Sequence, residues 1–423
     1  MKITEKKWID DYIESRREIL RIRPDLSIEK LTIGNSLEYI YQLLKPTGII
    51  YGFPVKMLEL TENLVLENDA LKTKIILLEG FIRTYEIHCL QNSKILTEKT
   101  TEEAVIKTGV FYGEIFPDLK EKSKGFFSGK EKEGLELSEF MIENHIDIKK
   151  SWDNFWNSFF DNSVLFLDLV YFHRWLEGGD LEQMKDHRQD FLIQVLEIII
   201  VTANVDGSWQ NEEKKIFQSF LHSAKLPEEK VNYLESIAHM NVDPEDLHLS
   251  RADNKVLIKY IYEIAVMTAG SNKEFDENEE KFLDDLAKIL HLDEQESQES
   301  LMAVEGFILQ HWESVHFLQT KHSFHLVKEQ FKKTASKVLS TNKEKISQEV
   351  RESKELMQLM TKSATQKLSD EEKAKVKSQL LDILKTIPTI AIFILPLGSL
   401  ILPLLLKVLP QSVIYPTAFY DKD

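Results

Sequence analysis

The sequence predicts an all-α protein, and three observations support this fold class. Glycine and proline are scarce, with 15 and 11 in 423 residues, and long segments contain neither, which favours helices over turn-rich β structure. Apolar residues recur every three or four positions along much of the chain, as on the buried face of a helix. Charged residues make up 29% and hydrophobic residues 43% of the chain, which predicts a folded core rather than disorder.

Composition also narrows the classes of partner and compartment. The formal net charge of -17 repels phosphate, so we expect no nucleic acid partner. A single cysteine, Cys89, allows no internal disulfide and fits a reducing cytoplasm. The start of the chain is charged throughout and lacks the apolar core of a signal peptide, so we expect most of the chain in the cytoplasm.

Residues 1–180 are expected to form a helical N-terminal region. Between residues 58 and 86, apolar residues follow one another in roughly helical steps. Breaks are predicted near residues 46–54 and 125–134, where proline, glycine or both gather. The aromatic segment 152–176 also has helical spacing, and we interpret it as a core or interdomain packing helix. A ligand pocket is the alternative for that segment.

The centre of the chain contains an internal repeat, in which residues 192–217 align without a gap to residues 258–283. The matching pairs include Glu197 with Glu263, Trp209 with Phe275, and Glu213 with Glu279. In each copy an apolar helix ends at a small polar turn, and a short acidic stretch then begins the next helix. We predict two helical hairpins, related by a pseudo-two-fold axis, that bury their apolar faces against each other.

The acidic turn of the repeat is a candidate site for a divalent cation. Carboxylate oxygens are common ligands of such cations, and the candidate ligands are Asp206, Glu213 and, in the second copy, Glu279. A calcium loop that ends at Glu213 would begin at Thr202, where such loops usually have Asp. The alternative is a helix N-cap with a solvated acidic face.

Residues 326–368 are predicted to form one long polar helix, within a helical connector of residues 301–367. Its apolar residues lie three or four apart, with one gap at Asn342, and they are Phe331, Ala335, Val338, Ile346, Val350, Met357, Met360 and Ala364. This spacing fits a coiled coil. It fits equally a single helix that packs along the globular part of the chain.

No motif of a familiar catalytic chemistry is present, so we expect that the protein is not an enzyme. The sequence has no Gly-rich phosphate loop, no HExxH and no Ser-His-Asp pattern. Four histidines lie close together, namely His311, His316, His322 and His325. Their spacing fits no standard zinc motif, and we interpret them as scattered polar residues.

A run without charge, TIPTIAIFILPLGSLILPLLL, occupies residues 386–406. At ~1.5 Å per residue, such a helix is ~30 Å long, which matches the hydrocarbon core of a bilayer. A charged side chain at the centre of a membrane helix costs about 2.5 to 3.5 kcal/mol, so the absence of charge predicts a membrane segment. The alternative is a buried core helix or a hydrophobic hairpin in a soluble protein.

Prolines punctuate this segment at intervals that place them near one helix face. They are Pro388, Pro396, Pro403 and Pro410. Each proline removes a backbone donor, which predicts a kinked or broken helix in an oligomer, with Gly398 allowing close approach between copies. Two half-helices that re-enter the membrane are the alternative. Lysines precede the segment, which favours a cytoplasmic N-terminal part.

The tail, residues 368–419, carries a series of motifs. They are a charged helix leading into Ile387-Pro388, the turn Pro396-Leu397-Gly398-Ser399, the pair Leu402-Pro403, Lys407 before Leu409-Pro410, and the closing Pro416-Thr417-Ala418-Phe419. In these features the tail resembles the membrane region of the leucine zipper–EF-hand-containing transmembrane (LETM) family. Members of that family sit in the mitochondrial inner membrane and are linked to potassium/proton or calcium/proton exchange. The chain looks most like a bacterial group described as LETM-related, biofilm-associated proteins.

The acidic turn carries a second resemblance. Asp206-Gly207 with Glu212-Glu213 matches the acidic turn of the TerB-like tellurite-resistance fold, and residues 185–300 are similar to that all-helical domain. The second copy keeps Glu279-Glu280 but has Asn272-Lys273 where Asp-Gly is expected. The resemblance implies a role in membrane-linked stress complexes and a bound metal ion.

These observations predict a membrane-anchored helical scaffold or sensor of the bacterial inner membrane, with residues 368–423 as a LETM-like membrane region. We expect its partners to be the lipid bilayer and either copies of itself or other membrane proteins. Two alternatives stay open. One is a component of an oligomeric cation/proton exchange system, which the tail resemblance implies. The other is a cytosolic TerB-like module that binds a metal or a partner.

Overall fold

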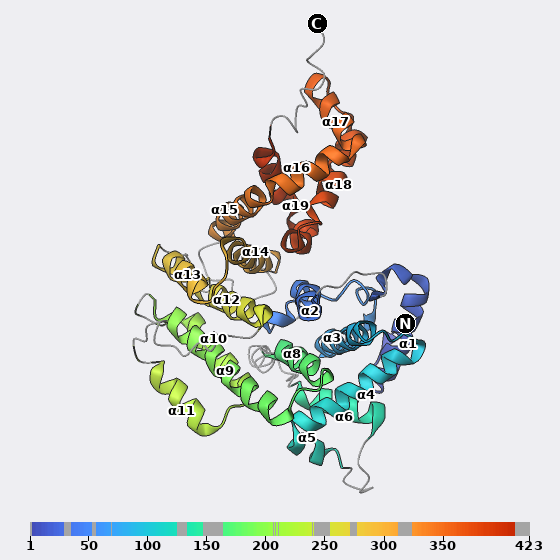
Figure 1. Ribbon diagram of the computed structural model, residues 1–423, viewed down its shortest axis with the longest axis vertical. Coiled ribbons are helices and arrows are strands. Elements are labelled where there is room, and N and C mark those ends of the chain that lie inside the picture. The colour runs from blue at the N-terminus through green and yellow to red at the C-terminus, as the bar shows by residue number, and fades with distance from the viewer. Residues whose placement is uncertain are drawn as a thin grey trace. The chain divides into compact units, whose positions relative to one another are not determined.

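A computed structural model shows that the described part of the chain is mostly helical, as predicted (Figure 1). The structure describes residues 2–28, 35–52, 56–68, 70–124, 133–146, 164–205, 207, 209, 211–238, 240, 254–270, 277–311 and 324–410. Contacts divide the chain into two compact units, Met1–Ser250 and Arg251–Asp423. The boundary falls inside residues 185–300, so the two copies of the internal repeat belong to different units.

Unit 1 is a helical domain with one short pair of strands. Its helices are α1 (Trp8–Ile22), α2 (Ser36–Leu44), α3 (Ala70–Gln91), α4 (Glu98–Ile115), α5 (Pro117–Lys122), α6 (Gly134–His145), α8 (Leu165–Leu176), α9 (Leu181–Ala203), α10 (Asn211–Ala224) and α11 (Glu228–Ile237). Short 3-10 turns cover Pro24–Leu26, Lys45–Thr47 and Ile49–Tyr51. The strands β1 (Lys2–Ile3) and β2 (Val65–Leu66) pair in parallel.

Helix α3 forms the centre of unit 1, because every residue from 75 to 87 is buried. A helix that is covered on all sides needs neighbours around it, and α3 packs against α2, α4 and α8. Phe81 of α3 meets Phe172 of α8 edge to face, with ring centroids 4.9 Å apart. Helix α8 is thus a core packing helix, as the aromatic spacing predicted for 152–176. Residues 152–163 of that segment lie outside the described residues.

Each copy of the repeat contains two helices that pack against each other. In unit 1, α9 packs against α10. In unit 2, α12 (Lys255–Ala269) packs against α13 (Glu277–Ile289). The predicted hairpins therefore exist, while their packing against each other stays a prediction.

Unit 2 continues from α12 and α13 with six further described helices. They are α14 (Glu294–Gln310), α15 (Phe324–Thr341), α16 (Lys343–Glu352), α17 (Lys354–Thr365), α18 (Asp370–Leu384) and α19 (Pro388–Val408). Helices α14, α15 and α19 pack against one another, α12 packs on α14, and α18 packs on α16, α17 and α19.

The prediction of one long polar helix over residues 326–368 is wrong, because the structure has three helices there, α15, α16 and α17. The first break is at Asn342, the position of the gap in the apolar spacing, whose backbone has φ −91° and ψ 8°. The second is at Ser353, which is extended and accepts a hydrogen bond from the amide of Leu356 as the N-cap of α17. Serine favours this cap position over a helix interior. Helices α16 and α17 both contact α18.

The apolar run of residues 386–406 forms the single helix α19, so the alternative of two half-helices is not what the structure shows. Its first residue is Pro388, where the missing amide hydrogen costs no intrahelical bond. Within the described residues, no helix is found that is long and apolar enough to cross a membrane. The membrane segment at residues 386–406 stays a prediction.

Candidate functional site

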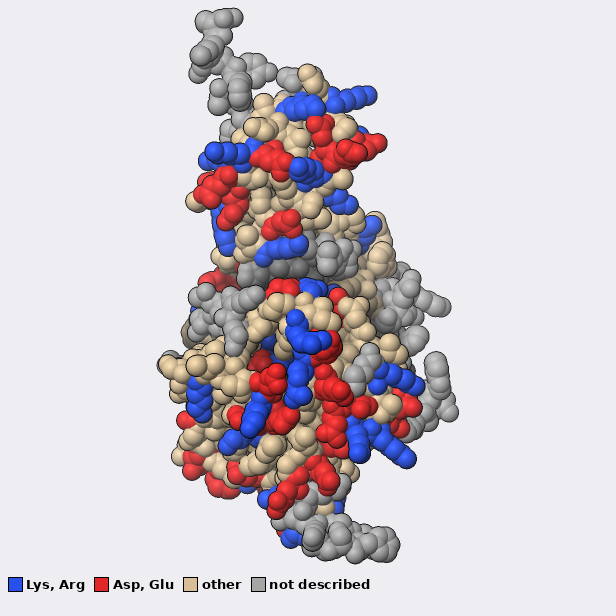
Figure 2. Space-filling view, turned by 90° about the vertical axis from the view of Figure 1, so that its right-hand side faces the viewer, with Lys and Arg blue, Asp and Glu red and all other residues tan. Residues whose placement is uncertain are grey.

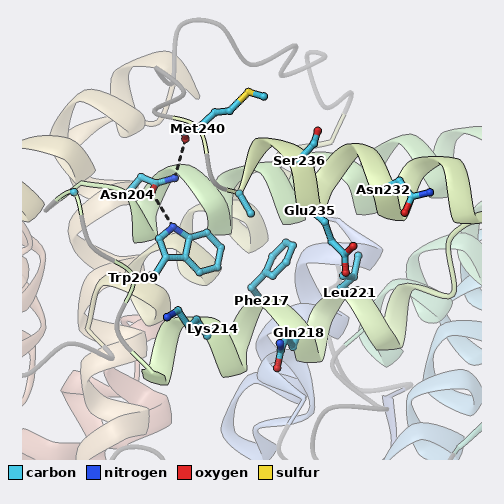
Figure 3. A pocket seen from close by; sticks show the side chains of 12 residues that line it. Asn204, Trp209, Lys214, Phe217, Gln218, Leu221, Asn232, Glu235, Ser236 and Met240 are labelled. Atoms are coloured by element: carbon cyan, nitrogen blue, oxygen red, sulfur yellow. Dashed lines mark hydrogen bonds between the residues drawn. The ribbon is translucent and has the colours of Figure 1, made fainter.

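A groove lies at the end of the first repeat copy in unit 1, between α10 and α11 (Figure 3). Its volume is about 1120 Å³, in the range of ligand and peptide sites. We call it the α10–α11 groove, and the lining residues used below are Asn204, Trp209, Lys214, Phe217, Gln218, Leu221, Glu235 and Met240.

Aromatic rings form the apolar part of the α10–α11 groove. Trp209 and Phe217 meet edge to face with centroids 5.3 Å apart. The indole Nε1 of Trp209 donates a hydrogen bond of 2.8 Å to the side-chain oxygen of Asn204. Asn204 ends α9 and donates in turn to the carbonyl oxygen of Met240 at 3.3 Å. These two hydrogen bonds fix the indole at one end of the groove (Figure 3).

The rim of the groove is polar and includes both signs of charge. Lys214 and Gln218 of α10 are exposed, and so is Glu235 of α11. An apolar floor with a polar rim is the usual anatomy of a surface that binds a peptide or a protein. The described lining residues supply contact area and hydrogen bonds, and the hydroxyl of Ser236 donates to the carbonyl oxygen of Tyr233.

Two of the three candidate cation ligands lie within the described residues, and both are buried. Glu213 of α10 is 1% exposed and Glu279 of α13 is 5% exposed, so the alternative of a solvated acidic face does not hold for either. They belong to different units. Asp206 lies outside the described residues. Among the residues that the structure describes, no group of three metal-ligating side chains is placed to hold an ion, and the divalent cation stays a prediction.

The position where the calcium loop would begin, Thr202, is helical, and the loop itself stays a prediction. Thr202 lies inside α9, where its hydroxyl donates to the carbonyl of Ile198 at 2.7 Å. The side-chain oxygen of Asn204, a candidate position of that loop, accepts a hydrogen bond from the indole nitrogen of Trp209. Thr268 in the second copy donates to Ile264 in the same way, so both threonines have a helical packing role.

The proline-rich helix α19 presents two different sides. Leu397, Ile401 and Leu405 are buried, and Gly398 faces α18, since a Cβ atom there would lie 3.2 Å from Leu381. Gly398 therefore serves contact between helices of one chain. Pro403 is exposed and Pro410 half-buried. The side chains of Pro388 and Pro396 lie outside the described residues.

Three buried polar clusters escaped the sequence analysis. In unit 1, Glu79 of α3 is paired with Arg16 and Arg83. Also in unit 1, Asp168 of α8 contacts His145 at 2.7 Å and accepts from Tyr112 at 3.0 Å. In unit 2, Glu305 of α14 is 1% exposed. Each carboxyl group interrupts an apolar run of the sequence, and that interruption is the sequence feature that could have predicted a buried acid.

The His145–Asp168 pair is closed to solvent and stabilises packing. Burial would raise the pKa of Asp168, but His145 and then Arg188 outweigh it and hold that pKa below its usual value. His145 also stacks on Phe116 with centroids 4.7 Å apart. Among the described residues His145 and Asp168 are buried against their partners, which is the arrangement of a packing contact.

Comparisons with known proteins return nothing: no family model, no curated protein and no solved structure matches the chain.

The charge on one face of the molecule is mixed in sign. The face in Figure 2 carries acidic and basic side chains intermixed, without a broad basic patch.

Proposed function

We propose that the chain is a non-enzymatic helical scaffold of the bacterial inner membrane, attached through α19, with most of its residues in the cytoplasm. The observation that carries the proposal is α19 itself. It is a helix of 21 residues whose sequence has no charge before Lys407. The resemblance of the tail to the LETM membrane region supports the same role.

The outward side of α19 supplies the membrane contact. Leu406 is 41% exposed, and Leu402, one helical turn earlier, is half-buried. Exposed apolar side chains at this spacing form a stripe that water solvates poorly and lipid accepts. The neighbouring face, about 100° around the helix, includes the buried Ile401 and Leu405, and α19 packs on α14 and α15. One helix can therefore join the folded part of the chain to a bilayer.

Vesicle flotation tests this attachment with charges placed on the outward side. The double substitution Leu402→Asp and Leu406→Asp should lower the floated fraction at least about tenfold, since each aspartate costs up to about 3 kcal/mol in a membrane helix. Ile22→Asp is the matched control, because Ile22 is an exposed apolar residue of unit 1 at 67%. It should float like the unaltered chain. Unaltered protein that stays at the bottom of the gradient would contradict the proposal.

The α10–α11 groove supports a second candidate function, the docking of an amphipathic partner helix. Its paired rings, Trp209 and Phe217, suit apolar anchors spaced along a helix. A photo-crosslinking residue at Leu221, inside the groove, should trap one partner of defined mass in cells. The same residue at Glu228, an exposed position of α11, should trap none, and Trp209→Ala should weaken the Leu221 adduct. Equal adducts at both positions would rule the groove out.

A further inference from the structure

Glu305 is a carboxyl group enclosed between helices of unit 2. It lies on α14 within the run LMAVEGFIL, residues 301–309, where it is the only charged residue. Its side chain is 1% exposed. The hydroxyl of Thr334 on α15 donates to Oε1 at 3.1 Å. Among the described side chains, Oε2 has no hydrogen-bond partner.

A buried carboxylate with one oxygen unpartnered is costly, whereas the neutral acid is tolerated. Burial accordingly raises the pKa of Glu305 to about 8, against smaller opposing effects of the Thr334 hydroxyl and Lys333. Thus Glu305 is mostly protonated at neutral pH. It changes charge within the range of pH that a cell can reach.

The groups that face Glu305 come from three other helices. Helix α15 contributes Lys333 and Lys337, and α13 contributes Glu280. Helix α12 contributes the buried hydroxyl of Tyr262. Lys333 is paired with Glu280 at 2.8 Å, so it is not bound to Glu305.

A small cavity is lined by Thr334, the hydrogen-bond partner of Glu305. Its volume is about 50 Å³, and its lining includes Thr334, Lys333, Lys337, Glu280 and Asp284. A polar cavity of that size can hold water. Helix α19 packs on both α14 and α15, and its only ionisable side chain, Lys407, is exposed. The packing of α19 therefore depends on the two helices that enclose Glu305.

We propose that Glu305 is a proton-binding latch that holds α15 against α14, and with them α19, and that releases this packing when it loses its proton. The protonated carboxyl fits the apolar interface and accepts from Thr334. The ionised carboxylate is stabilised by opening of the interface to water. In this way a change of pH would control how firmly α19 is held, and its consequence for attachment rests on the proposed role of α19 at the membrane.

The direction of the effect follows from linkage between protonation and opening. The pKa is about 8 in the closed state and near the ordinary value of 4.5 once the carboxyl is solvated. The closed state binds the proton more tightly, so its extra stability is fully present below pH 4.5. That stability is lost as pH rises, by about tenfold in the opening equilibrium per pH unit. The loss levels off above about pH 8.

Hydrogen exchange of the full chain without membranes measures this opening directly. Protection factors of peptides from α14, α15 and α19, corrected for intrinsic exchange, should fall about tenfold per pH unit between about pH 5 and pH 8. In Glu305→Gln the slope should vanish, because the amide keeps the side chain neutral. Glu299→Gln, on the same helix but not buried, should keep the slope of the unaltered chain.

A second variant tests the latch independently of Glu305 itself. The Thr334 hydroxyl lowers the pKa of Glu305, so Thr334→Val should extend the slope to higher pH. The proposal is overturned if the unaltered chain and Glu305→Gln show the same slope, or if Thr334→Val leaves its end point in place. The exchange experiment contains no membrane, so its outcome does not depend on whether α19 binds vesicles. The latch and the membrane attachment can therefore fail separately.

Discussion

Single residues in unit 1 show how a folded helical chain accommodates charge in its interior. Arg16 of α1 is 2% exposed and contacts Glu79 at 2.8 Å and Glu86 at 2.9 Å. Burial would raise the pKa of Glu79, but Arg16 and Arg83 outweigh it and hold that pKa below its usual value. The two arginines and two glutamates balance in charge. Removing one partner therefore leaves a buried charge uncompensated.

Arg16→Ala should lower the free energy of unfolding by about 3 to 5 kcal/mol, because Glu79 and Glu86 would keep only Arg83. The neighbouring substitution Arg17→Ala should cost less than about 1 kcal/mol, because the Arg17–Glu102 pair is nearly half exposed. Urea titration followed by tryptophan fluorescence measures both, since Trp8 and Trp175 lie in unit 1. Equal losses in the two variants would show that the buried network is not a stabilising unit.

Some of the buried carboxyl groups could be predicted from the sequence, and others could not. The repeat alignment paired Glu213 with Glu279, and the structure buries both. The alignment did not show that Glu213 and Glu279 would be buried, since acidic residues in a first helical turn are usually solvated. Glu305 was visible as one charge in an apolar run, but the partner that encloses it, Thr334, is distant in sequence and was not predictable.

Helices of unit 1 approach closely where a side chain is missing. Helices α4 and α6 cross at Gly109, where an added Cβ atom would lie 2.9 Å from the backbone nitrogen of Ser138. Ser138 cannot move away cheaply, because its hydroxyl donates to the carbonyl of Val105. The contact between these helices therefore depends on glycine.

Gly109→Ala should destabilise unit 1 by about 1 to 3 kcal/mol, because the two backbones must separate. Gly113→Ala, on the same helix, should be neutral or stabilising by up to about 1 kcal/mol. A Cβ atom there meets only the flexible side chain of Lys120. Thermal unfolding followed by circular dichroism compares the two variants. A stability loss at Gly113 as large as that at Gly109 would contradict this account.

At the scale of elements, sequence periodicity predicted helices well and helix breaks less well. The helix break at Asn342 was visible as a gap in the apolar spacing, whereas the break at Ser353 left no such gap. A serine within a helical pattern either caps a new helix or stays in the old one, and packing against α18 decides between the two. The α10–α11 groove was not predictable, because its floor combines residues from α10, α11 and the turn after α9.

Over the whole molecule, the fold class followed from composition, but the division into units did not. The two repeat copies predicted one domain of residues 185–300, whereas contacts place them in units 1 and 2. The role of α19 is the other question that sequence leaves open. A helix that is apolar on all sides fits either a protein core or a bilayer. Its packing on α14 and α15 accounts for one side only, and Leu406 marks the other.

Fractionation of cells tests the central claim, that α19 attaches the chain to the inner membrane. The unaltered chain should sediment with membranes and stay there after a high-salt wash, which screens charge contacts but not apolar ones. The Leu402→Asp, Leu406→Asp variant should remain folded and move to the supernatant. If the unaltered chain is found in the supernatant, α19 is only a core helix of unit 2 and the proposed attachment is wrong.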